Sequence, residues 1–167
     1  LIPPGGLDNF GSGFLPATFQ GTTMRAGKNP ILHLSPQPEV TADRQQKALS
    51  LLRQLNQQHA EQRDFDAELL ARVNSYELAF RMQATAPEVV DISQESSATH
   101  KMYGIGGKDT DEFGRRCLLA RRMVERGVRF VQLYSGDTGG WDAHNNVTTN
   151  HDLYCRRTDL PVAGLLQ

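Results

Sequence analysis

Several features are missing from this 167-residue sequence, and each absence excludes a class of protein. No apolar run approaches the ~20 residues that a membrane-spanning helix needs. Acidic and basic residues nearly balance at a net charge of −1, so no general attraction to nucleic acid or to an anionic membrane is expected. Internal repeats, a Gly-x-Ser-x-Gly elbow and a Ser-His-Asp arrangement are also lacking. We therefore expect no membrane span, no nucleic-acid partner and no serine-hydrolase chemistry.

Cysteine is scarce, with only Cys117 and Cys155. Neither lies in a Cys-x-x-Cys pair, which disfavours a cysteine-based zinc site. The two residues are either a disulfide formed in an oxidising compartment or two small, buried thiols. A chain of this size does not need a disulfide to stabilise its fold, so we favour free thiols.

The chain begins Leu-Ile-Pro-Pro-Gly-Gly, with neither an initiator Met nor a signal-peptide pattern. It ends within a predicted helix that has no stop signal. The expectation is an internal fragment of a longer protein, a partial single domain over residues 1–167. Three regions are predicted within it: an irregular loop region at 1–40, a helical region at 41–126, and a strand, loop and helix at 127–167.

The helical region has clear apolar periodicity. Thr41 is a suitable N-cap for a helix to about residue 58, and an aromatic stripe predicts a second helix over about 64–83. A connector is expected at 87–91, and a short helix at about 93–102, capped by Ser93, precedes a glycine-rich turn. A third long helix should start at Thr110 or Asp111 and end at Gly127. Its predicted buried face consists of Phe113, Cys117, Leu118, Ala120 and Val124, while its arginines are expected mostly at the surface.

A predicted strand at Val128–Tyr134 follows directly, and the dense apolar residues indicate burial on at least one face. Helix and strand would form an α/β unit. Three glycines within residues 135–141 then predict a tight loop that ends in Asp142 and His144. A final helix should start near Thr148 or Asn150, with a kink or break at Pro161.

Asp142 and His144 are ligand types that suit zinc or another divalent ion. Asp-x-His is a short pattern, and its support comes from its place in a glycine-rich loop beyond a strand, where α/β sheets bind ligands. A stable zinc site needs three or four ligands, and the nearest additional residues are Asp137, His151 and Asp152. His151 is either a partner that hydrogen-bonds to a ligand of the site or an exposed residue near a helix start. Trp141 either lines one side of this site or belongs to the hydrophobic core.

Four blocks in order give the chain a family resemblance. They are Ser-Tyr-Glu-Leu-Ala-Phe-Arg-Met-Gln at 75–83, Phe-Gly-Arg-Arg-Cys-Leu-Leu-Ala-Arg-Arg at 113–122, Gly-Val-Arg-Phe-Val-Gln at 127–132 leading to Gly-Trp-Asp-Ala-His at 140–144, and Asp-Leu-Pro-Val-Ala at 159–163. Together they resemble the bacterial family called domain of unknown function 1501, whose members are often labelled sulfatase-like. That family is grouped with the alkaline phosphatase superfamily, and its members usually begin with an export signal.

The resemblance implies an α/β fold: a fragment of an alkaline-phosphatase-like sheet-and-helix domain, helix-rich with few strands in this part. It implies that Asp142 and His144 are ligands of a divalent metal such as zinc or calcium. The implied function is hydrolysis of small phosphate or sulfate esters by an exported protein. An alternative is a non-catalytic exported binding or scaffold protein on the same fold.

Other site segments expected from the resemblance are missing. They are an Asp-bearing glycine loop, a Glu-Phe-Gly-Arg-Thr-Pro segment and a C-terminal Asp-His. Residues 112–115 match only the first four residues of the second segment. The nucleophile is therefore expected outside these residues, and the fragment by itself is expected to be inactive.

Overall fold

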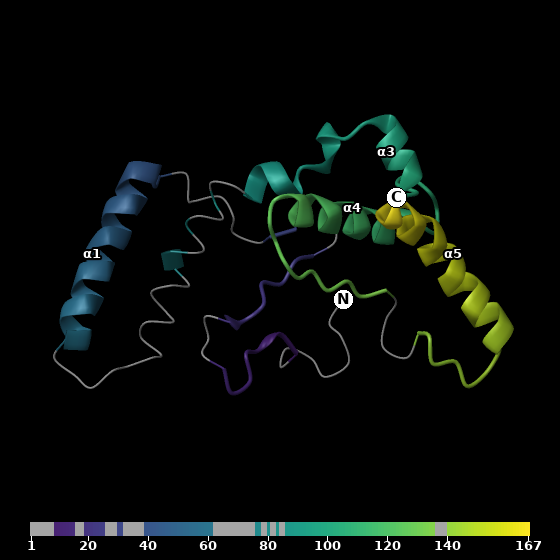
Figure 1. The fold of residues 1–167 in the computed structure, drawn as a ribbon, viewed down its shortest axis with the longest axis horizontal. Coiled ribbons are helices and arrows are strands. Elements are labelled where there is room, and N and C mark those ends of the chain that lie inside the picture. Colours follow the sequence, from purple (N-terminus) through teal and green to yellow (C-terminus); the bar gives the residue numbers. More distant parts are fainter. Residues whose placement is uncertain are drawn as a thin grey trace. The chain divides into compact units, whose positions relative to one another are not determined.

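The computed structural model describes residues 9–15, 19–25, 30–31, 39–61, 76–77, 80, 83, 86–135 and 140–167. The described part is rich in helix (Figure 1). Its elements are α1 (Ala42–Glu61), the 3₁₀ helix η3 (Ile92–Gln94), α3 (Ser97–Met102), α4 (Asp111–Glu125) and α5 (Val147–Leu166). Among these residues, no helix combines the length and apolar character that crossing a membrane requires.

The chain divides into two compact units. One comprises residues 1–7, 24–30 and 88–167, and the other comprises residues 8–23 and 31–87. The candidate site lies in the first of these, together with η3, α3, α4 and α5.

Helix α1 belongs to the other unit and confirms the predicted N-terminus. The Thr41 hydroxyl accepts a hydrogen bond from the Arg44 amide at 3.3 Å, as an N-cap side chain does. The helix ends at Glu61, three residues beyond the expected end. Leu51, Leu52 and Leu55, which form its apolar stripe, are exposed.

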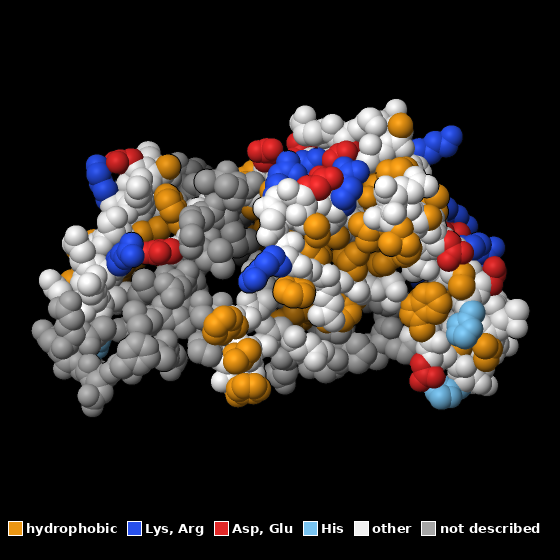
Figure 2. Space-filling model, in the orientation of Figure 1, with side chains coloured by type: hydrophobic (Ala, Val, Ile, Leu, Met, Phe, Trp, Pro, Cys, Tyr) orange, Lys and Arg blue, Asp and Glu red, His pale blue; other side chains and the backbone are white. Residues whose placement is uncertain are grey.

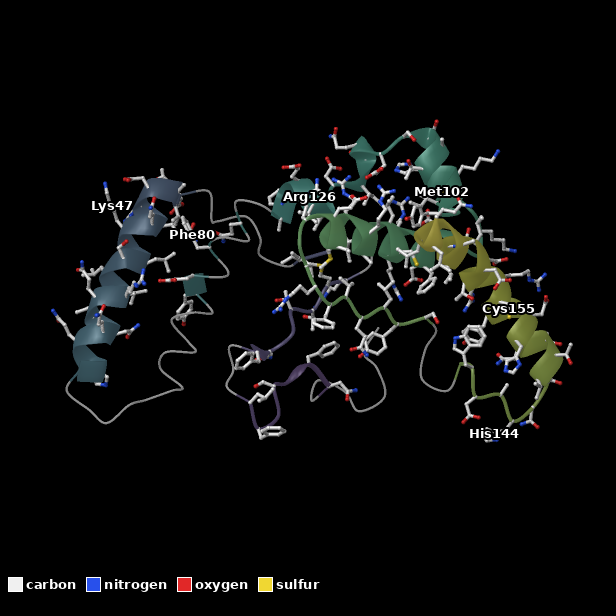
Figure 3. All side chains as sticks on the ribbon, in the orientation of Figure 1. Lys47, Phe80, Met102, Arg126, His144 and Cys155 are labelled. Atoms are coloured by element: carbon white, nitrogen blue, oxygen red, sulfur yellow. The ribbon has the colours of Figure 1, made fainter. Side chains whose placement is uncertain are left out.

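Most of the second predicted helix (64–83) lies outside the described residues. Residues 76, 77, 80 and 83 within it are helical. Two side-chain contacts join this segment to α1: Arg53 with Glu77 at 3.2 Å and Gln45 with Gln83 at 2.8 Å. Phe80, which is labelled in Figure 3, belongs to the same helical segment as Glu77 and Gln83.

Two predictions around residue 90 are wrong. The expected connector is helical over residues 86–90, because proline has a helical φ and is tolerated where its missing N–H is not needed. The predicted cap Ser93 lies inside η3, which Asp91 caps by accepting from the Ser93 amide. Ser96 caps α3 instead, because its hydroxyl accepts from the Thr99 amide.

The core of this unit is built on Tyr103, which is fully buried together with Cys117 and Leu118. Two glycines let helices approach the backbone at this point. A Cβ at Gly114 of α4 would overlap the Tyr103 carbonyl oxygen, and one at Gly164 of α5 would lie 2.8 Å from the Met102 carbonyl oxygen. The two long helices therefore converge on the end of α3, and Figure 1 shows this convergence beside the C-terminus.

The N-terminus and C-terminus of α4 agree with the prediction. Thr110 occupies the N-cap position, although its hydroxyl donates to the Gly104 carbonyl at 2.5 Å instead of capping. Gly127 ends the helix with a φ of 90°. On the buried face Cys117 is enclosed, whereas the prediction for Val124 is wrong because its side chain is exposed.

Arg122 occupies a buried place that the sequence did not indicate, and only 6% of it is exposed. Its guanidinium donates to the carbonyls of Val89 at 2.9 Å and Glu88 at 2.7 Å, and to the Glu95 carboxylate at 2.6 Å. Arg121 also pairs with Glu95 at 2.8 Å, and this hydrogen bond holds the pKa of the Glu95 carboxyl below its usual range. Acidic and basic side chains lie together over this part of the surface (Figure 2).

The predicted strand at Val128–Tyr134 is wrong for the structure described. Residues 128–135 have no regular secondary structure, and the described residues include no strand to pair with them. A strand needs such a partner because its N–H and C=O groups bond to a neighbouring backbone. The segment instead contacts the helices, since Leu133 packs on the core and Arg116 donates to the Tyr134 carbonyl at 2.8 Å. An α/β sheet is accordingly not seen in the described part, and the helix-rich character is confirmed.

Helix α5 runs from Val147 to Leu166 with Pro161 buried inside it, so of the predicted kink or break the break is excluded. Cys117 and Cys155 are both free, as favoured above. Burial raises the pKa of the Cys117 thiol to about 11, so this group is a packing residue and not a reactive thiolate.

Candidate functional site

The loop that carries the candidate ligands enters α5 through a left-handed residue. Asn146 has a φ of 51° and occupies the N-cap position, a conformation that asparagine tolerates better than most residues. The Asn150 side-chain amide donates to the Gly140 carbonyl at 2.6 Å and so joins the first turn of the helix to the start of the loop. Helix α5 consequently begins at Val147, slightly earlier than predicted.

Asp142 and His144 face each other across the loop. Asp142 Oδ2 lies 3.3 Å from His144 Nε2, and the two side chains are 79% and 82% exposed. Figure 3 shows His144 at the end of α5 that is far from α4.

This donor set is chemically suited to a divalent cation. A carboxylate oxygen and an imidazole nitrogen are ordinary zinc ligands, and both side chains are open to solvent. In the contacts described, neither side chain is buried in the core or paired with Lys or Arg. The pair can therefore turn its two donor atoms toward a shared ion.

The additional ligands proposed from the sequence are not brought to this pair. His151 Nε2 lies 3.0 Å from the Trp141 carbonyl, and Asp152 pairs with Arg156. Asp137 lies outside the described residues. Within residues 86–135, 140–167 and the other described ranges, no group of three or more His, Cys, Asp and Glu side chains forms a metal-binding cluster.

Trp141 forms part of an aromatic cluster beside the pair and is not a core residue. Its side chain is 41% exposed, and its ring lies 5.3 Å from the Tyr154 ring and 6.2 Å from the His151 ring, centroid to centroid. The indole N–H lies 3.2 Å from both the carbonyl and the hydroxyl of Ser135.

The place of His151 and Tyr154 in this cluster was not predicted from the sequence. They are three residues apart on α5, so helical spacing places them on one face. This three-residue spacing indicates a shared face only if both residues lie in the helix, so it can be used only once the start of α5 is known.

Comparisons with known proteins give one result. A protein-family model described as "Protein of unknown function (DUF1501)" matches residues 2–167. No curated protein and no solved structure matches the chain. The family match covers nearly the whole chain but does not indicate an activity, a ligand or a fold.

Proposed function

Since the chain belongs to the DUF1501 family, a family of unknown function, we propose that Asp142 and His144 hold a divalent cation in a hydrolase of phosphate or sulfate esters. The observation that carries the proposal is the pairing of the two side chains. They face one another at 3.3 Å and remain open to solvent. A buried or diverging pair would have removed the basis for a metal site.

In this proposal a bound cation neutralises the charge of an anionic ester and activates an oxygen nucleophile. Asp142 contributes negative charge that favours binding of the cation, and His144 contributes a neutral nitrogen donor. The remaining ligands and the nucleophile come from residues outside the described part. The proposed substrate is a small anionic ester, and its leaving group is not specified by these two residues.

The same proposal includes the alkaline-phosphatase-like α/β fold and an exported location. Residues 128–134 are suited to join a sheet because Val, Phe and Leu are concentrated there, and Phe130 is 89% exposed. Another element packed on the face of that sheet would cover this side chain. Export is supported by the resemblance of the four sequence blocks alone.

A second candidate is an exported binding or scaffold protein without turnover. It is favoured by the exposure of both ligands and by the absence of a third ligand among the described residues. In this case the cation would organise the loop or bridge to another molecule.

Metal binding by the longest natural form of the protein gives the first test, and Trp141 serves as a reporter because it directly precedes Asp142. Titration with Zn²⁺ or Co²⁺ should change its fluorescence. Asp142→Ala and His144→Ala should each weaken the response by about 10-fold or more, since ligand sets this small depend on every member. Asp152→Ala is the matched control, because this carboxylate pairs with Arg156, and it should bind the ions as the unsubstituted chain does. Equal affinity in all four proteins would contradict the proposal.

Turnover separates the two candidate functions. The longest natural form of the protein should hydrolyse 4-nitrophenyl phosphate or 4-nitrophenyl sulfate, and Asp142→Ala should abolish that activity. Metal binding without turnover of either ester would favour the binding or scaffold function. Fractionation of the native cells, with the protein outside the cytoplasm, checks the location.

A further inference from the structure

The loop with the candidate ligands is attached to its surroundings at the residue just before Asp142. The indole N–H of Trp141 reaches Ser135, upstream of the glycine-rich segment. The backbone carbonyl of the same Trp141 lies 3.0 Å from His151 Nε2 on α5. Trp141 is thus held twice. Its side chain is held by Ser135, which precedes it in the sequence, and its main chain is held by His151, which follows it.

We propose that His151 and Trp141 are positioning residues for the divalent cation at Asp142 and His144. The Trp141 carbonyl belongs to the peptide unit that joins Trp141 to Asp142. A hydrogen bond to this oxygen therefore fixes the peptide plane from which the Asp142 side chain departs. This inference rests on the proposed function and assigns to two further residues the task of orienting the ligand.

The contact with the Trp141 carbonyl indicates which ring nitrogen of His151 carries a proton. A carbonyl oxygen only accepts, so Nε2 carries the proton and donates it. His151 is half-buried on α5, whereas Asp142 and His144 lie in a loop without regular structure. A donor on a helix can thus order a loop before the ion arrives, which reduces the entropy lost on binding.

Ring contacts alone do not provide this orientation. The rings of Trp141 and His151 are tilted by 38° at a centroid distance of 6.2 Å, and Tyr154 lies against the same indole. These contacts locate the indole side chain, but rotation of the peptide plane remains free unless its carbonyl is held. The hydrogen bond and the ring contact can therefore be separated by substitution.

Two replacements of His151 make this separation. His151→Gln retains a nitrogen donor at nearly the position of Nε2, and His151→Phe retains a ring beside Trp141 without a donor. We expect His151→Phe to weaken Zn²⁺ binding by about 10-fold and His151→Gln to restore most of the affinity. Binding is measured by Trp141 fluorescence with Zn²⁺ and repeated with Co²⁺, whose absorption spectrum reports the ligand geometry. The spectrum of His151→Phe should differ from that of the unsubstituted protein, and the spectrum of His151→Gln should match it.

Thermal unfolding of both variants without metal identifies a purely structural role. The buried contacts of α5 with α3 lie near Pro161 and Gly164, so both variants should unfold close to the temperature of the unsubstituted protein. If the unsubstituted protein binds Zn²⁺ and His151→Phe binds it equally tightly, the positioning role is overturned and the proposed site remains. Equal losses of affinity in His151→Phe and His151→Gln also overturn it. Absence of Zn²⁺ binding by the unsubstituted protein overturns the proposed function and the positioning role together.

Discussion

Replacing Gly114 by alanine is expected to lower the free energy of unfolding by about 3 kcal/mol, since overpacking against backbone is costly. An alanine in a helix interior is otherwise preferred over glycine by about 1 kcal/mol. Here the added methyl group would overlap the carbonyl oxygen of Tyr103, a fully buried residue at the centre of the core. Backbone cannot swing aside as a flexible side chain can, so α4 has to move away from α3. Urea unfolding followed by circular dichroism measures the change.

Two further variants calibrate this result. Gly164→Ala, whose added Cβ would lie 2.8 Å from the Met102 carbonyl oxygen, should also be destabilising but by less. Val162→Ala, on the exposed side of the same helix, should leave the free energy of unfolding almost unchanged or raise it slightly. An increase in stability for Gly114→Ala would show that α3 and α4 do not approach as closely as described.

Replacing Arg122 by methionine should lower the free energy of unfolding by about 3 kcal/mol, the scale for breaking a buried charge network. Methionine fills much of the same volume and donates no hydrogen bonds. The carbonyls of Glu88 and Val89 would lose their donor, and Glu95 would retain only its contact with Arg121. Arg122→Lys should be intermediate, because an ammonium group cannot match the planar fork of a guanidinium.

Arg126→Met is the matched control for this network. Arg126 lies one helical turn further along, and its partner Glu88 is largely exposed, so the expected loss is below about 1 kcal/mol. Denaturant midpoints and slopes for the three variants measure these differences. Similar small losses for Arg122→Met and Arg126→Met would contradict a structural role for the buried guanidinium.

Local signals predicted much of the helical structure. Thr41, Thr110 and Gly127 mark helix ends in the sequence, and the structure has α1 and α4 at these positions. The cap at Thr41 and the left-handed Gly127 involve only neighbouring residues, whereas the Thr110 hydroxyl bonds to the Gly104 carbonyl and does not cap α4. The same local character explains why the glycine-rich turn after α3 was predicted correctly, with Gly104 and Gly106 at positive φ.

Properties that depend on distant residues were predicted less well. The segment at 128–134 has the composition of a strand, yet strand formation requires a second backbone, which the described residues do not supply. Arg122 resembles the other arginines of its helix in sequence, and only the fold brings two carbonyls and a carboxylate around it. Val124 has a helical spacing suited to the core but faces solvent.

For the candidate site, Asp142 and His144 were chosen from the sequence for their ligand types and their place in a glycine-rich loop, and their role as metal ligands stays a prediction. It could not show that His151 holds the Trp141 carbonyl, since that contact depends on where α5 begins and how the loop turns back to it. The sequence by itself therefore determined several helix ends and the turn after α3, which follow from short-range backbone preferences. Only the tertiary structure decided which side chains are buried and which groups meet, because both depend on the way separate segments pack.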